Sequence, residues 1–112
     1  MNITFPILEK KIRELVADNP DYVYPAKNEL CVYNAGQDLP PCIFGRAFIE
    51  LGFPLPSYYE GSSISGILRD LKIEHSRGDL VWADTLQGNQ DRGRPWGLCL
   101  TIADEQRKAF EE

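Results

Sequence analysis

The sequence predicts a mainly helical α+β domain in which four to five short helices pack around a central apolar helix, beside one small β-hairpin. Residues 42–51 are apolar on almost every side, follow two prolines and stop at Gly52. A helix that is apolar all round belongs in the core of a domain, and Gly commonly ends a helix. Two short runs rich in aromatic and β-branched residues, 21–24 and 30–33, flank turn residues and predict the hairpin.

Length and composition fit one globular domain covering residues 1–112. The hydrophobic share of 43% is ordinary for a folded domain. Twelve basic and seventeen acidic side chains leave a net charge of −5, so the surface on average repels nucleic acid and anionic lipid. The chain has neither a signal-peptide pattern nor an apolar run of about 20 residues. We therefore expect a soluble cytoplasmic protein, without a membrane partner, whose Cys31, Cys42 and Cys99 are reduced.

The first helix is predicted from a cap at Thr4 to a stop at Asn19-Pro20. Thr is a favoured N-cap residue, and Pro6 is tolerated in the first turn. Apolar residues then recur at three- and four-residue spacing, as expected for an amphipathic helix: Phe5, Leu8, Ile12, Leu15 and Val16.

The remaining helices follow the central one. Residues 57–60 can form one helical turn, and Ser63 can cap a helix that ends before residue 76. A further helix is expected to start near Asp79, because an acid favours the positive end of the helix dipole, and to end near Gly93. Trp96 opens the last helix, whose strongly charged tail, residues 104–112, is expected to fray.

No constellation of residues indicates catalysis, a cofactor or a metal. His75 is the single histidine and lies in a predicted loop, without the partners that a catalytic triad requires. Together with the three cysteines it could supply four zinc ligands, but the paired spacing typical of zinc sites does not occur. Nucleotide-binding glycine motifs do not occur either. We expect a protein that is not an enzyme and carries no cofactor.

Two segments are candidate partner-binding sites. Arg92, Arg94 and Trp96 place two guanidinium groups near an indole, and these residue types dominate binding energy in interfaces. Trp96 also begins an amphipathic helix, so both the core and the surface stay open for it. Tyr58 and Tyr59, beside prolines and a glycine, are the tyrosines expected at the surface. The polar run 87–91 is expected on an exposed helix face.

Several motifs resemble a group of small uncharacterised proteins of actinobacteria and their bacteriophages. The resemblance covers roughly residues 19–97, and the motifs that carry it are NPDYVY (19–24), CVY (31–33), PCIFGRA (41–47), LGFPL (51–55), QDRG (90–93) and PWG (95–97). The resemblance implies an accessory protein of a phage that acts in a bacterial cytoplasm. It implies no activity and no catalytic residue.

These observations together predict a small non-catalytic phage accessory protein that binds a host or phage protein. One alternative is a nucleic-acid-binding regulator, with a helix-turn-helix formed by residues 63–72 and 79–91. Its second helix carries Asp79, Asp84 and Asp91, whereas a helix in the major groove needs cations. The other alternative is a small-molecule-binding domain, with Arg46, Asp91 and tyrosines around a pocket.

Overall fold

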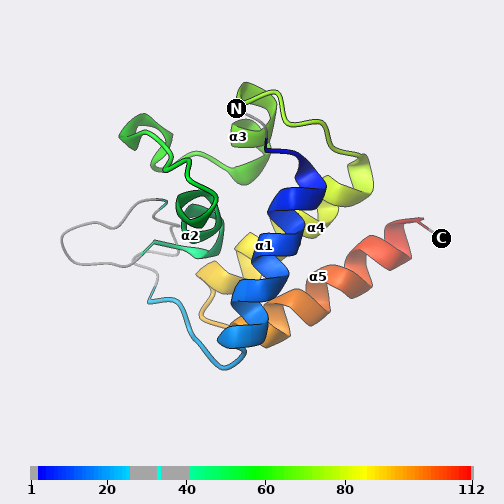
Figure 1. The fold of residues 1–112 in the computed structure, drawn as a ribbon. Coiled ribbons are helices and arrows are strands. Elements are labelled where there is room, and N and C mark those ends of the chain that lie inside the picture. Colours follow the sequence, from blue (N-terminus) through cyan, green and yellow to red (C-terminus); the bar gives the residue numbers. More distant parts are fainter. Residues whose placement is uncertain (1–2, 26–32, 34–40, 112) are drawn as a thin grey trace.

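The computed structural model describes residues 3–25, 33 and 41–111 as a bundle of short helices (Figure 1). The elements are α1 (Phe5–Asp18), α2 (Ile43–Glu50), the 3-10 turn η1 (Ser57–Tyr59), α3 (Ile64–Asp70), α4 (Arg77–Asp91) and α5 (Trp96–Glu111). In Figure 1, α1 crosses in front of α4, and α2 stands on the side of α1 away from the C-terminal end of α5. The largest interface joins α4 to α5, and α1 packs on both α2 and α5.

Helix α1 confirms the predicted cap, face and stop. The Thr4 hydroxyl oxygen accepts the Ile7 N–H at 3.3 Å, and a proline occupies the first turn. The predicted apolar residues are all buried, with exposed fractions of at most 4%. At the other end the Asn19 N–H donates to Leu15 O at 3.0 Å, and Pro20 follows, so the helix cannot continue.

Helix α2 occupies the core as predicted, with one difference. Ile43, Phe44, Ala47 and Phe48 are fully buried. Leu51, which we expected to be buried as well, is only half-buried because it is the C-cap residue, where the chain leaves the helix. Each of the five α-helices contributes large, fully buried side chains to the core, as do three residues outside the helices, Tyr24, Tyr33 and Leu55; the helical ones are Phe5, Leu8, Ile12, Ile43, Phe44, Phe48, Ile64, Trp82 and Trp96.

Gly45 lets the backbone at Tyr33 approach the central helix closely. A Cβ atom placed on Gly45 would lie 2.0 Å from the backbone carbonyl oxygen of Tyr33. Any side chain at this position would therefore force the chain at Tyr33 away from α2. Tyr33 itself is fully buried, so this contact holds the backbone at Tyr33 against α2.

The structure corrects the prediction of a β-hairpin at its first run, 21–24, because the described part of the chain contains no strand. Residues 21–25 are irregular, and residues 26–32 lie outside the described part. Instead of pairing with a second strand, this segment caps α5: Pro20 O accepts the Gly97 N–H at 2.8 Å, and Tyr22 O accepts the Trp96 N–H at 2.9 Å. The first N–H groups of a helix have no partner within it, so these carbonyls satisfy them.

Three helices end in the same way, with one exception in residue type. In α2, α3 and α4 the residue after the C-cap has a positive φ angle, and the next residue's N–H bonds back to the last turn, as in a Schellman motif. Gly52 and Gly93 occupy this position after α2 and α4, as predicted. After α3 it is Lys72, with φ of 58°. A left-handed conformation costs a residue with a Cβ about 1–2 kcal/mol.

Helix α4 starts two residues before the predicted position, and a capping box explains the difference. Ser76 is the N-cap residue: its hydroxyl accepts the Asp79 N–H, and the Asp79 carboxylate accepts the Ser76 N–H, both at 3.0 Å. Asp79 thus lies near the start, as its charge suggested, but as the third helical residue. Ser63 caps α3 as predicted by accepting the Gly66 N–H at 3.2 Å.

A charged network joins α5 to α1 across Trp82 of α4. Arg13 bonds Asp104 at 2.7 Å and Glu9 at 2.9 Å, and Arg107 bonds Glu9 at 2.8 Å. The Arg13 and Arg107 guanidinium groups lie 5.7 and 5.1 Å from the centre of the Trp82 ring. Within residues 104–112, expected to fray, the helix extends to Glu111 and two charges are engaged in this network.

Cys42 differs from the expectation that all three cysteines are reduced, and Cys99 agrees with it. Cys42 is disulfide-bonded, so the expectation that it is reduced is wrong, while Cys31 lies outside the described residues. Cys99 is a free, buried thiol, and burial raises its pKa to about 11. Among the described residues, no helix is both long and apolar enough to cross a bilayer.

The surroundings of Gly45 and Gly88 predict that replacing each with alanine changes the free energy of unfolding in opposite directions. Gly45→Ala should destabilise the protein by about 3 kcal/mol, because the new methyl group overlaps the Tyr33 backbone. Gly88→Ala, in the middle of α4 where the added Cβ would have no neighbour within 4 Å beyond its own stretch of helix backbone, should stabilise it by about 0.5–1 kcal/mol. Urea unfolding of both variants measures these changes. Equal effects at the two sites would contradict the close approach.

The network predicts an acid-sensitive part of the stability. Arg107 chiefly holds the pKa of Glu9 below its usual value. For Asp104, partial burial opposes but does not overcome the hydrogen bonds from Arg13 and Trp82, which also lower its pKa. A lowered pKa stabilises the fold above the unfolded-state pKa of about 4, and this contribution disappears as the pH falls through the folded-state value.

Glu9→Gln should therefore lower the free energy of unfolding at pH 7 by about 1–2 kcal/mol and have little effect near pH 2. Urea unfolding at the two pH values measures the difference. Glu105→Gln, at an exposed position of α5, is the control. A destabilisation by Glu9→Gln that persists unchanged at low pH would contradict the role of the charge.

Candidate functional site

The polar run of α4 is buried, which corrects the expectation that it lies on an exposed face. Gln87, Asn89 and Gln90 have exposed fractions of 8%, 6% and 0%. Buried amides must find hydrogen-bond partners, since an unpaired buried polar group is costly. Asn89 donates to Thr85 O at 2.8 Å and accepts from Arg94.

The two glutamines bind the N-termini of two other helices. Gln90 Oε1 accepts the Ile43 N–H at the start of α2 at 2.7 Å, and Gln87 Oε1 accepts the Ile64 N–H at the start of α3 at 3.1 Å. Gln87 Nε2 also donates to the Tyr33 hydroxyl at 2.8 Å. Burial raises the pKa of that hydroxyl to about 12. These polar residues hold the fold together and are not available to a partner.

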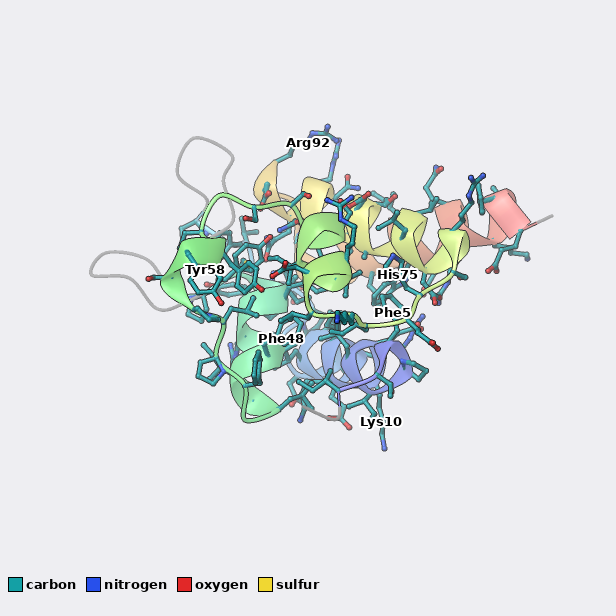
Figure 2. The ribbon with its side chains drawn as sticks, turned by 90° about the horizontal axis from the view of Figure 1, so that it is seen from above. Phe5, Lys10, Phe48, Tyr58, His75 and Arg92 are labelled. Carbon is teal, nitrogen blue, oxygen red and sulfur yellow. The ribbon has the colours of Figure 1, made fainter. Side chains whose placement is uncertain are left out.

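The corner formed by Arg92, Arg94 and Trp96 does not present an aromatic anchor. Trp96 is fully buried, with its ring edge-on to Tyr22 at a centroid distance of 4.7 Å. This decides the alternative that the sequence left open, in favour of the core. Arg94 donates to the Asn89 side chain. Arg92 is exposed and projects from the molecule in Figure 2, so the surface here offers cations without an indole.

The η1 corner does present an aromatic side chain at the surface. Tyr58 has an exposed fraction of 74%, the largest among the exposed large hydrophobic side chains of the described residues. The Tyr59 ring lies beneath it at a centroid distance of 4.7 Å, and Tyr59 is buried, so the expectation that Tyr59 lies at the surface is wrong. Figure 2 places Tyr58 at one edge of the molecule, away from Arg92. The two sequence-predicted segments therefore form separate surfaces.

A hollow of about 510 Å³ opens beside these rings, and we call it the tyrosine hollow. Its lining consists of two aromatic rings, hydroxyl-bearing and small residues, and one carboxylate: Tyr58, Tyr59, Ser62, Ser63, Gly66 and Asp70. The Tyr59 hydroxyl donates to the Asp70 carboxylate, which raises the pKa of Tyr59. None of the ion pairs formed among the described residues includes Asp70.

Sequence reasoning missed Asp70. It lies eleven positions after Tyr59, at the far end of α3, with no motif that marks it. Only the fold of η1 back onto α3 brings the two side chains together. A carboxylate at the C-terminal end of a helix is disfavoured by the helix dipole, and this is the one local signal that could have singled it out.

The geometry of the described residues does not favour the zinc site or the helix-turn-helix that were considered from the sequence. Within residues 3–25, 33 and 41–111, no group of three His, Cys, Asp or Glu side chains is arranged to hold a metal ion. The proposed zinc set includes Cys42, which is disulfide-bonded. For a helix-turn-helix, α4 would have to enter a groove, but Trp82 and Leu86 bury it in the core while Asp84 is exposed.

Comparison of the chain with protein-family models, with curated proteins and with solved structures found no match. The resemblance to small actinobacterial and phage proteins therefore stays a prediction from the motifs. The arguments about function below accordingly use the geometry and the chemistry of this chain's own residues.

The corner geometry predicts that two neighbouring arginines differ in their effect on stability. Arg94→Ala should lower the free energy of unfolding by about 1 kcal/mol, because it leaves the largely buried Asn89 oxygen without its donor. Arg92→Ala, at an exposed position, should change it by less than about 0.5 kcal/mol. Thermal unfolding compares the two. Equal melting temperatures would show that the Arg94–Asn89 bond contributes nothing.

Proposed function

We propose that this protein is a non-catalytic binding protein whose partner inserts a basic side chain, Lys or Arg, into the tyrosine hollow. In keeping with the resemblance, the partner is a host or phage protein and the complex forms in the bacterial cytoplasm. The observation that carries the proposal is the combination, around one hollow, of an exposed Tyr58, a buried Tyr59 and the Asp70 carboxylate, which forms no ion pair with another described residue.

The exposure of Tyr58 supports an interaction surface. Tyrosine offers a large contact area at a low cost in conformational entropy, and it is enriched among the residues that dominate binding energy. Tyr58 lies against Tyr59, which hydrogen-bonds to Asp70. Tyr59 thus holds the Tyr58 ring in place, so a partner that covers the ring loses less conformational entropy on binding.

The charge of the hollow supports a cationic group as the occupant. A cation over the face of a tyrosine ring is attracted by the negative charge of that face, and a nearby carboxylate adds to this attraction. Asp70 supplies the carboxylate, and Glu60, next to Tyr59, is exposed. The whole protein carries a net charge of −5, which speeds the approach of a basic partner.

Site-specific crosslinking tests the proposal. A photoreactive phenylalanine analogue is placed at position 58, and crosslinking is carried out inside the cells that produce the protein. Position 58 should give a defined crosslinked partner, whereas the same group at position 110 should not. Phe110 is a matched control because it is aromatic, half-exposed and on α5. Mass spectrometry should locate the crosslink beside a Lys or Arg of the partner.

Two substitutions then separate the ring from the charge. Tyr58→Ala should weaken binding of the identified partner by at least about tenfold, with little change in melting temperature. Asp70→Asn keeps an acceptor for Tyr59 but removes the charge, and it should weaken binding more than the control Glu105→Gln. Equal crosslinking from positions 58 and 110, or binding that Asp70→Asn leaves unchanged, would refute the proposal.

A further inference from the structure

A second hollow lies on another side of α3 and shares no lining residue with the tyrosine hollow. It has a volume of about 780 Å³ and lies between the turn after α3 and the start of α4. The polar residues that line it are Arg69, Lys72, Glu74, His75, Ser76 and Asp79. Figure 2 shows His75 far from both Tyr58 and Arg92. We call it the basic hollow.

The residue type at position 72 requires an explanation. Lys72 has a positive φ angle, and among the described residues it is the one non-glycine that does. The equivalent turns after α2 and α4 use Gly52 and Gly93. Glycine adopts this conformation without strain, whereas lysine does not. A strained residue that the surrounding hydrogen bonds hold in place points to a use for its side chain.

The cations of the basic hollow form no ion pair with a carboxylate of the described residues. None of the ion pairs formed among the described residues includes Arg69 or Lys72. The two residues are three positions apart, at the end of α3 and in the turn that follows it. Arg offers a planar fork of donors and Lys a compact ammonium, and both groups bind phosphate oxygens.

His75 adds a third donor of fixed orientation. Its Nδ1 lies 2.8 Å from Ile73 O, and because a carbonyl oxygen only accepts, Nδ1 carries a hydrogen. Nε2 is then the nitrogen left for a ligand: it donates to a phosphate oxygen when the ring carries a second hydrogen, and otherwise accepts from a protonated phosphate oxygen. The Ser76 hydroxyl accepts from Asp79 N–H, so its own hydrogen can be donated to the same ligand.

Two carboxylates line the basic hollow, and they differ in their hydrogen bonds and ion pairs. Asp79 is engaged on both oxygens: Oδ2 accepts the Ser76 N–H at 3.0 Å, and Oδ1 lies 3.5 Å from Arg107 Nη1. Glu74 is exposed and takes part in none of the ion pairs among the described residues. Of the two carboxylates that line the hollow, Glu74 is therefore the one whose charge no cation among the described residues offsets.

We propose that the basic hollow binds a phosphate group, either free or as the monoester of a small molecule. A tetrahedral dianion offers enough oxygens to use donors from Arg69, Lys72, His75 and Ser76 together, whereas a carboxylate offers two. The ligand is small, because a net charge of −5 opposes the approach of an extended polyanion such as nucleic acid. The inference is independent of the partner proposed for the tyrosine hollow.

Lys72→Gly is the decisive variant, because the proposal gives it opposite effects on folding and on binding. Removing the strained side chain should leave the melting temperature equal or higher. It should also weaken phosphate binding by about tenfold or more, through loss of a charged hydrogen bond. Arg92→Ala is the control: it makes the same change in net charge at an exposed position elsewhere and should leave binding within about twofold.

Binding is measured by titrating the full chain at low ionic strength with inorganic phosphate, phenyl phosphate and acetate, by calorimetry and by the NMR signals of residues 69–76. Phosphate and phenyl phosphate should both bind and shift those signals, and acetate should bind more weakly. Glu74→Gln should tighten phosphate binding by about threefold, because it removes the opposing charge.

Three outcomes would overturn the proposal. One is the absence of any saturable shift with phosphate or phenyl phosphate. Another is an equal loss of affinity in Lys72→Gly and Arg92→Ala, which would mean that only overall charge matters. The third is acetate binding as tightly as phosphate, which would mean a carboxylate site. Tighter binding of phenyl phosphate than of phosphate would assign the ligand as a monoester.

Discussion

The fold depends on hydrogen-bond acceptors for the backbone N–H groups at the starts of its short helices. Helix α4 provides two of these acceptors from its side chains. Helices of 7 to 16 residues have a large share of their backbone at the ends, where donors lack partners within the helix. Gln90 and Gln87, buried on α4, accept the first N–H groups of α2 and α3. A polar stripe in the core thus fixes the positions of two helices relative to a third. Apolar side chains alone would allow these helices to slide and rotate, whereas a hydrogen bond to a buried glutamine holds one register.

The same constraint explains why the segment after α1 is not a strand. Its carbonyl groups at Pro20 and Tyr22 accept the first N–H groups of α5, so they are not available to a sheet. Gly97 allows this approach, since a Cβ there would lie 3.0 Å from Pro20 O. The charged network of Glu9, Arg13, Asp104 and Arg107 then ties the middle of α5 to α1. The largest helix of the protein is held at its start by backbone carbonyls and further along by side-chain charges.

The two hollows have opposite chemistry although both are built on α3. Asp70, in the tyrosine hollow, and Arg69, in the basic hollow, are neighbours in the chain. Successive residues of a helix diverge by about 100°, so adjacent side chains serve different surfaces. A helix of seven residues that is fixed at its start by Ser63 and Gln87 can therefore carry a carboxylate for a cation on one side and a guanidinium for an anion on the other. Both proposals rely on α3 being held rigidly by the core.

The sequence by itself determined the local features of this protein. Helix ends and helix periodicity are local properties, so they follow from residues a few positions apart. These features are the caps at Thr4 and Ser63, the stop at Asn19-Pro20, the turns at Gly52 and Gly93, and the apolar faces of α1 and α2. The tertiary structure decided the rest. Contacts between distant segments decide that Trp96 lies in the core and that Gln87 and Gln90 are buried. They also decide that Cys42 forms a disulfide and that Tyr59 meets Asp70. The same polar residue suits an exposed face or a buried hydrogen bond, and only the position of the other helices selects between them.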